Sequence, residues 1–154
     1  MRFTSESHKR LQQFFRQHRG EADLILPVIE WDVSAAARLV VRTSGVTAMT
    51  LGTRVLFEPK ALREDADGRF WIRSRLAAHE ATHVLQYQRM GWGGFLWNYL
   101  GDYAGQMQQA AKWNAAAHFR SYQAIRAERE AQAAEDAYTN WSGRGEEELW
   151  AKLT

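Results

Sequence analysis

The residues best suited to chemistry form one short segment, His79-Glu80-Ala81-Thr82-His83. Two histidines four residues apart on a helix lie on the same face about one turn apart, so both imidazoles can bind one metal ion. Glu80 lies beside His79 rather than on that face, where its carboxylate can reach a water molecule on the metal without binding the metal itself. The segment therefore predicts a zinc site with a general base next to it.

The residues around this segment favour a helix that faces a packed core. They are uncharged and mostly apolar: Leu76, Ala77, Ala78, Ala81, Thr82, Val84 and Leu85. A helix surrounded by solvent would carry charges at several of these positions. The alternative is that His79 and His83 are two buried histidines that bond to neighbouring groups, with Glu80 on the helix surface.

A zinc ion with three protein ligands keeps a fourth position for water and lowers the pKa of that water to about 7. Glu80 would accept the proton of that water and later pass it to the leaving amine. We therefore expect a zinc-dependent peptidase that acts on a peptide or protein substrate. The alternative is an inactive zinc-binding module with a structural or binding role.

The third ligand must come from another part of the chain. The extended pattern that adds a third histidine needs Gly at position 86 and His at position 89, whereas the chain has Gln86 and Arg89. The chain contains no cysteine, so only His, Asp or Glu can complete the site. The candidates are His8, His18 and His118, or a carboxylate within residues 127–136.

Two resemblances to known families refine this choice. The motif helix, followed about 45 residues later by Glu128-Arg129-Glu130-Ala131-Gln132, is similar to the gluzincin metallopeptidases, in which a Glu-x-x-Ala-Asp segment provides the third ligand. This resemblance implies that Glu128 binds the zinc, and Gln132 stands where the family has Asp. More broadly, three segments look like the metallopeptidase domain of core proteins of extracellular contractile injection systems: Val46–Gly52, His79–Gln88 with Gly91, and the Glu128 segment. This resemblance covers residues 38–138 and implies a minimal zincin fold.

Further residues remain candidates for the site. Glu130 is the alternative third ligand, but it points about 200° away from Glu128 on a helix, so the two cannot both bind from regular geometry. An oxyanion forming in the reaction would need a hydrogen-bond donor, and the candidates are Tyr122, His118, Tyr87 and Tyr99. The charged residues from 127 to 136 would otherwise be a solvated helix face.

The elements that position these residues predict an α+β fold with one domain over residues 1–154, and the resemblance implies that this fold is of the zincin type. An N-terminal helix over residues 1–20 should end at Gly20, since Leu11, Phe14 and Phe15 recur at helical spacing. Residues 24–57 predict a small, mostly antiparallel sheet of three or four strands, from Leu24–Ile29, Leu39–Arg42 and a hairpin over Val46–Phe57. Further helices are expected over residues 70–90, which carry the motif, 106–138, which carry the third ligand, and 144–154.

The predicted hairpin has a second possible role. A strand at the edge of a sheet can pair with an extended peptide through main-chain hydrogen bonds. Either Val46–Thr50 or Arg54–Phe57 could bind substrate in this way, or the hairpin could be purely structural.

Charge and hydropathy limit the partners that we expect. The 20 basic and 18 acidic residues give a formal charge of only +2, so we expect no nucleic-acid partner. No run of apolar residues approaches the length of a membrane span, and the sequence does not open with a basic segment followed by an apolar run, as a signal peptide would. We therefore expect a cytoplasmic protein, unless it is exported by a route that needs no cleavable signal. The resemblance to injection-system core proteins implies a partner within a secretion or phage-like apparatus, of which the inactive zinc-binding alternative would be a structural or binding module; an inhibitor is a further candidate partner.

Overall fold

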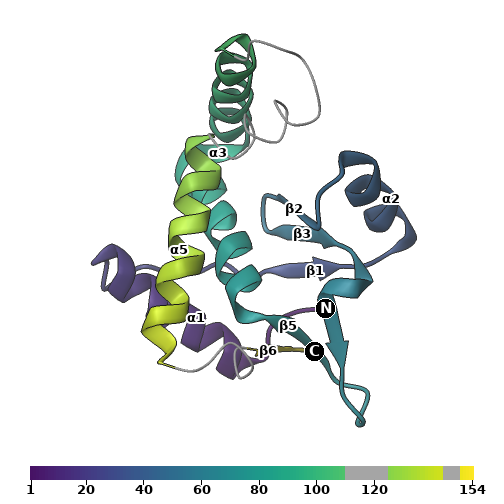
Figure 1. Cartoon of the computed structure of the whole chain (residues 1–154). Helices are drawn as coiled ribbons and strands as arrows, with labels where there is room; N and C mark the ends of the chain where they lie inside the picture. The colour runs from purple at the N-terminus through teal and green to yellow at the C-terminus, as the bar shows by residue number, and fades with distance from the viewer. Residues whose placement is uncertain (110–124, 144–149) are drawn as a thin grey trace.

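The fold is centred on a pair of helices, α3 (Ser74–Gln109) and α5 (Arg126–Ser142), which lie side by side in Figure 1. The structure is a computed structural model of the chain, and it describes residues 1–109, 125–143 and 150–154. Within the described residues, α1 covers one side of the helix pair, and two small sheets lie on the other side and at the base. The architecture is therefore α+β, as the sequence predicts.

Helix α1 (Ser5–Arg19) forms as its pattern predicts. The Thr4 side chain accepts a hydrogen bond from the Ser7 amide at the start of the helix, and Gly20 adopts the left-handed conformation at its end. Leu11, Phe14 and Phe15 are buried in the main core, as their spacing indicates.

The first sheet contains the predicted hairpin. Strands β2 (Ala48–Leu51) and β3 (Arg54–Phe57) pair antiparallel, with Thr50 opposite Val55, and Gly52 lies in the turn with a φ of 66°. Strand β1 (Glu30–Asp32) pairs with β3 in parallel, which gives the order β1-β3-β2. Strand β3 is therefore central, and β2 lies at an edge.

Two of the strands predicted within residues 24–57 are wrong. Residues Leu24–Ile29 form no strand, although Leu26 and Ile29 are buried in the core while Ile25 and Val28 are exposed. Residues 39–42 lie in a helix, α2 (Ala35–Ser44), and not in a strand.

The ends of α2 explain why β-branched residues become helical there. The Ser34 side chain accepts a hydrogen bond from the Ala37 amide, and Gly45 ends the helix in the left-handed conformation. Ala37 and Val41, four residues apart, pack against Leu56 of β3. These local signals outweigh the strand preference of the valines. Leu39 and Val40 of α2 remain exposed, at 65% and 39%.

The second sheet contains β4 (Leu62–Glu64), β5 (Phe70–Arg73) and β6 (Trp150–Leu153), all paired antiparallel in the order β4-β5-β6. A short 3-10 helix, Pro59–Ala61, precedes β4. The helix predicted from residue 70 therefore begins only at Ser74, since residues 70–73 form a strand in which Ile72 is fully buried.

The C-terminal helix predicted over residues 144–154 is wrong in its last part, and residues 144–149 lie outside the described chain. Residues 150–153 form β6 because both edges of this segment find main-chain partners. One edge pairs with β5, and on the other the Thr4 amide donates to the Lys152 carbonyl. Leu153 is also buried in the core, which fixes the strand against the N-terminal residues.

Helix α3 changes direction at the predicted stop. Gly91 has φ 68° and ψ 170°, values outside the helical region, and the chain resumes a helix after it. The helix predicted over residues 106–138 is divided in the structure. Its first residues belong to α3 and its last residues to α5, which continues to Ser142. Residues 110–124 between them lie outside the described part.

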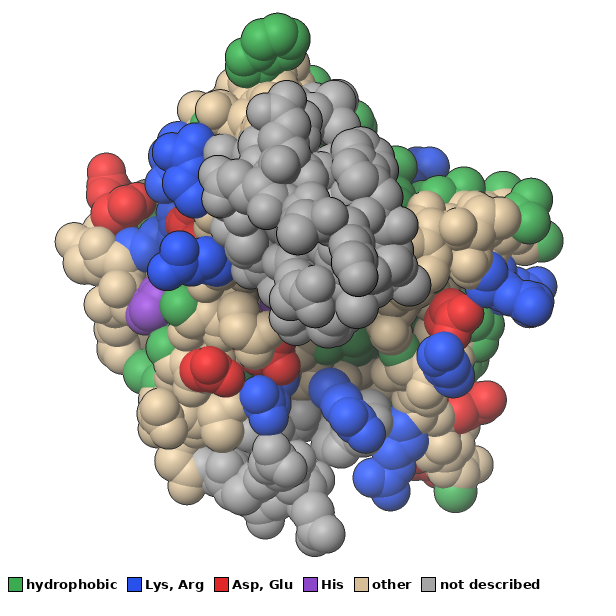
Figure 2. Space-filling model, turned by 45° about the horizontal axis from the view of Figure 1, so that its top comes forward, with side chains coloured by type: hydrophobic (Ala, Val, Ile, Leu, Met, Phe, Trp, Pro, Cys, Tyr) green, Lys and Arg blue, Asp and Glu red, His purple; other side chains and the backbone are tan. Residues whose placement is uncertain are grey.

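The surface carries charges of both signs. Figure 2 shows acidic and basic side chains interspersed on the face that it presents. Among the described helices, none combines the length and the apolar character that crossing a membrane requires.

Candidate metal centre

The two motif histidines project from the same face of α3, as their spacing requires. Their ring centroids are 5.1 Å apart. The helix cannot rotate easily, since Ala77, Ala78 and Ala81 around the histidines are buried in the core. The core therefore fixes the direction in which both imidazoles point.

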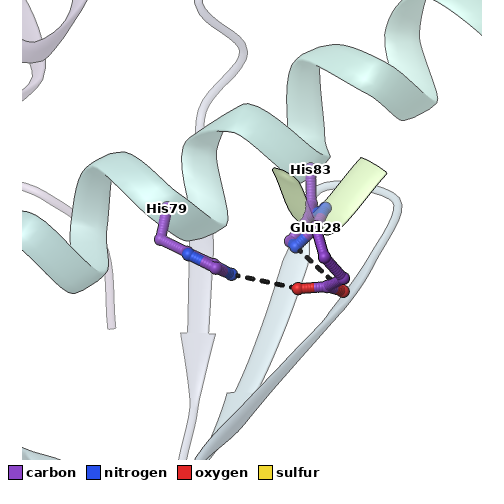
Figure 3. Close-up of side chains that lie close together, drawn as sticks. All are labelled: His79, His83 and Glu128. Atoms are coloured by element: carbon purple, nitrogen blue, oxygen red, sulfur yellow. Dashed lines mark ion pairs between the residues drawn. The ribbon is translucent and has the colours of Figure 1, made fainter. Parts of the chain in front are cut away.

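Glu128, in the first turn of α5, completes a cluster with these histidines. Its Oε2 lies 3.5 Å from His79 Nε2 and its Oε1 lies 3.5 Å from His83 Nε2, as Figure 3 shows. One ligand atom from each residue lies within 4.8 Å of the others. The structure thus brings together the three residues that the gluzincin resemblance implies.

The spacing of this cluster fits a tetrahedral metal ion. Two ligands about 2.1 Å from a tetrahedral centre lie about 3.4 Å from each other. The two separations of 3.5 Å, one from each carboxylate oxygen of Glu128, are close to this value and exceed the length of about 2.8 Å that a direct charge-assisted hydrogen bond prefers. Two imidazoles and one carboxylate are also a donor set that zinc uses in catalytic sites.

The cluster holds opposite charges when no metal is bound. Burial acts to lower the pKa of His79, but Glu128 and Glu135 outweigh it and raise this pKa from 6.5 to about 10. His83 behaves alike: burial acts to lower its pKa, and Glu128 raises it overall. Burial acts to raise the pKa of Glu128, whereas the two histidines lower it from 4.5 to about 2.

Each histidine also has a second partner on its Nδ1 atom. Glu135 Oε2 lies 3.3 Å from His79 Nδ1, and Gln86 Oε1 lies 2.9 Å from His83 Nδ1. Because both Nδ1 atoms are occupied in this way, both Nε2 atoms are left to face Glu128. Such partners orient imidazole ligands in metal sites.

The sequence reasoning missed the roles of Glu135 and Gln86, although the spacing held a signal for both. Glu135 follows Glu128 by seven residues, or about two helical turns, and so lies on the same face of α5. Gln86 follows His83 by three residues, which places it one turn further along α3. Gln132, at the position where gluzincins have Asp, is exposed.

Glu80 is buried next to the cluster. Its side chain is 4% exposed, and its Oε2 accepts a hydrogen bond of 2.6 Å from the Thr50 hydroxyl on β2. Its negative charge acts on both histidines, and raises the pKa of each. Strand β2 therefore passes directly beside the carboxylate that the motif marks as a base.

The alternative third ligand, Glu130, does not join the cluster. Its Oε1 lies 2.8 Å from an Arg19 guanidinium nitrogen, and its Oε2 accepts a hydrogen bond of 2.9 Å from the Gln86 amide. It points away from Glu128, as two residues of separation on a helix require.

The other candidates lie elsewhere or outside the described chain. His118 and Tyr122 fall within residues 110–124, and the Tyr99 side chain is also not among those described. Tyr87 is buried, with its ring centroid 4.0 Å from that of Phe95 and the two rings tilted by 30°, and burial raises its pKa. His18 stacks on Phe14 within α1.

The comparison with known families matches residues 7–91 to the eCIS core domain, where eCIS denotes an extracellular contractile injection system. The match covers more than half of the chain, from α1 through both motif histidines to the turn at Gly91. It begins earlier than the predicted resemblance over residues 38–138 and stops before Glu128. Neither the curated proteins nor the solved structures contain a match to the chain. With its matched region spanning α1, the first sheet and the histidine motif, the chain belongs to the eCIS core domain family.

Proposed function

We propose that the chain is a zinc-dependent peptidase, with zinc held by His79, His83 and Glu128 and with Glu80 as general base. The observation that carries this proposal is the convergence of both histidine Nε2 atoms on Glu128 at the spacing of a tetrahedral site, with Glu80 buried beside them. A zinc ion at such a site supplies an activated water and polarises the substrate carbonyl.

The residues of the chain would divide the remaining work. Glu80 accepts the proton of the attacking water on one carboxylate oxygen while Thr50 holds the other by its hydroxyl. Glu80 then passes that proton to the nitrogen of the leaving amine. Glu135 and Gln86 keep the two histidine rings in orientation during these steps.

Strand β2 is the proposed binding site for an extended substrate. It pairs with β3 on one side only, and among the described residues no strand pairs with its other edge. Thr50 places β2 next to Glu80, so a peptide that paired with this edge would run past the general base. The alternative strand Arg54–Phe57 is excluded as an edge, since β1 and β2 flank it.

The test begins with metal content. We expect about one zinc per chain in the parent, and loss of that zinc in His83→Ala. A parent protein that is purified without metal and fails to take up added zinc would overturn the metal site.

The catalytic part is tested with Glu80→Gln. The amide has the same shape and can still accept the Thr50 hydrogen bond, but it cannot take up a proton. We expect the variant to bind zinc as the parent does and to cleave nothing in a peptide library whose products are identified by mass spectrometry. Equal cleavage by variant and parent would contradict the role of Glu80.

A second candidate function is a zinc-stabilised module of the injection apparatus without turnover. The burial of the cluster favours it, since His83 and Glu128 are each only 6% exposed and join α3 to α5. The membership in the eCIS core family makes a partner within the apparatus the natural context. A parent protein that gains stability with zinc but cleaves no peptide would support this function over the first.

A further inference from the structure

Gln86 is a fully buried polar side chain next to the proposed metal centre. It lies on α3 with no exposed surface. Burial of an amide is unfavourable unless its polar atoms form hydrogen bonds. The contacts of Gln86 therefore indicate what the fold uses it for.

All polar atoms of this amide have partners. Its Nε2 donates to the Ala127 carbonyl at 3.1 Å and to Glu130 Oε2 at 2.9 Å, and its Oε1 lies 2.9 Å from His83 Nδ1. The carbonyl and the carboxylate can only accept, so the amide nitrogen must face them. The amide oxygen must then face His83.

This orientation determines the tautomer of His83. Because Gln86 Oε1 can only accept, Nδ1 of His83 must carry a hydrogen. A neutral imidazole then has its lone pair on Nε2, the atom that faces Glu128. This is the form of His83 that can bind a metal together with Glu128.

The same amide is also linked to the third ligand. Ala127, whose carbonyl it binds, directly precedes Glu128 in α5. Glu130, its other acceptor, is held by Arg19 from α1 at 2.8 Å and lies 3.4 Å from Arg89 on α3. Gln86 thus connects the ring of one ligand to the backbone beside another.

We infer that Gln86 is a positioning residue of the metal centre, which fixes the tautomer of His83 and, with Glu130 and Arg19, the register of α5 that places Glu128. This inference rests on the proposed metal site and deepens it. It assigns Glu130 the task of holding Gln86 in place of the ligand role considered from the sequence.

The main test is the zinc affinity of Gln86→Met. Methionine keeps the length and helix preference of glutamine but removes both hydrogen-bonding groups. We expect zinc affinity, measured by competition with a chromophoric chelator, to fall about 10- to 100-fold. The visible spectrum of the cobalt-substituted protein should also change, since it reports ligand geometry and not fold stability.

The matched control is Gln88→Met, the same substitution at an exposed position of the same helix. It should bind zinc and give a cobalt spectrum like the parent. If Gln86→Met fails to fold, Glu130→Ala provides the test, since the Glu130 side chain is 38% exposed and its loss leaves the core intact. We expect Glu130→Ala to weaken zinc binding by a smaller factor.

The outcomes separate this inference from the function on which it rests. If Gln86→Met folds and binds zinc as tightly as the parent, the positioning role is wrong and the metal site is unaffected. The same holds for Glu130→Ala if Gln86→Met does not fold. A parent that binds no zinc would overturn both. Weakened binding with an altered cobalt spectrum, and no change in Gln88→Met, would support the role.

Discussion

Zinc binding to this cluster at neutral pH should release protons. The pKa of His79 is about 10 and that of Glu128 about 2, so at pH 7 the metal-free protein carries a cationic His79 against an anionic Glu128. The pKa of His83 is also raised, because Glu128 outweighs the effect of burial. A metal binds only the neutral imidazole, so His79 must lose a proton when zinc enters, and His83 must lose one to the extent that it is protonated.

The size of the effect follows from these pKa values. A pKa of about 10 lies three units above pH 7, and each unit corresponds to about 1.4 kcal/mol, so deprotonation of His79 costs on the order of 4 kcal/mol at that pH. This cost decreases as the pH rises. The apparent zinc affinity should therefore increase about tenfold per pH unit for each proton released, and we expect one to two protons per zinc.

Isothermal titration calorimetry measures this release directly. Zinc is added to the metal-free protein in two non-chelating buffers that have different heats of ionisation, and the difference in heat gives the number of protons. Chelator competition between pH 6.5 and 8 gives the slope of affinity. A zinc complex that forms at pH 7 without proton release, with affinity independent of pH, would refute the paired charges at the cluster.

Glu135→Gln provides a variant that changes one cause alone. It removes one of the three carboxylates, those of Glu128, Glu135 and Glu80, that raise the pKa of His79. The pH above which zinc affinity stops rising should then be lower than in the parent. An unchanged profile would show that Glu135 does not act on His79.

Two further predictions concern stability. In the metal-free protein, the contribution of His79 to the free energy of unfolding is fully present below pH 6.5 and is lost as the pH rises through about 10, while that of Glu128 is present above pH 4.5 and is lost as the pH falls through about 2. Denaturant unfolding in the presence of a chelator should therefore show the largest stabilisation from this pair between pH 4.5 and 6.5. Equal stability at pH 6 and pH 9 would contradict this prediction. Gly52→Ala should destabilise by about 1–2 kcal/mol, since φ is 66° there and a Cβ would lie 2.7 Å from the Trp92 ring. Gly45→Ala is the control, with φ 69° but open space around it, and a Gly52→Ala that costs no more would contradict the contact with Trp92.

The features that the sequence predicts correctly depend on short-range signals. The two histidines share a face of α3 because their spacing is one helical turn, and no distant contact can change that. The hairpin of β2 and β3 follows from a glycine turn between two apolar runs. Helix α1 follows from its apolar spacing and from Gly20 at its end.

The error at α2 could have been avoided from the sequence. Ser34 stands directly before three alanines, and Gly45 follows the helix, which are start and stop signals of a helix. The valines at positions 40 and 41 suggested a strand instead. Here capping at both ends and the burial of Val41 outweighed the preference of β-branched residues.

The error at β6 could not have been avoided in this way. Residues 150–153 form a strand only because β5 and the N-terminal residues offer main-chain partners on both sides. Those partners lie about eighty and about one hundred and fifty residues earlier in the chain. Local preference contains no information about such pairing, and the preceding acidic residues favoured a helix.

The choice between Glu128 and Glu130 also depended on distant contacts. An alanine-rich helix can present either residue to the histidines, because its small side chains leave its rotation weakly determined. The structure decides between them through Arg19 on α1, which binds Glu130 and so turns Glu128 toward the cluster. The carboxylate that joins the two histidines is therefore set by a contact with a residue that no local motif contains.

The positions at which the chain departs from known zinc-peptidase patterns have a common explanation. Gln86 and Arg89 replace the Gly and His of the extended pattern, and both lie against Glu130. Gln132 replaces the Asp of the gluzincin segment and is exposed, while Glu135, about one turn later, provides the carboxylate beside His79. The departures at positions 89 and 132 thus remove a familiar ligand and a familiar partner, and Glu128 and Glu135 of α5 face the histidines of α3 instead. The geometry of the cluster can therefore be retained even where the sequence pattern is not.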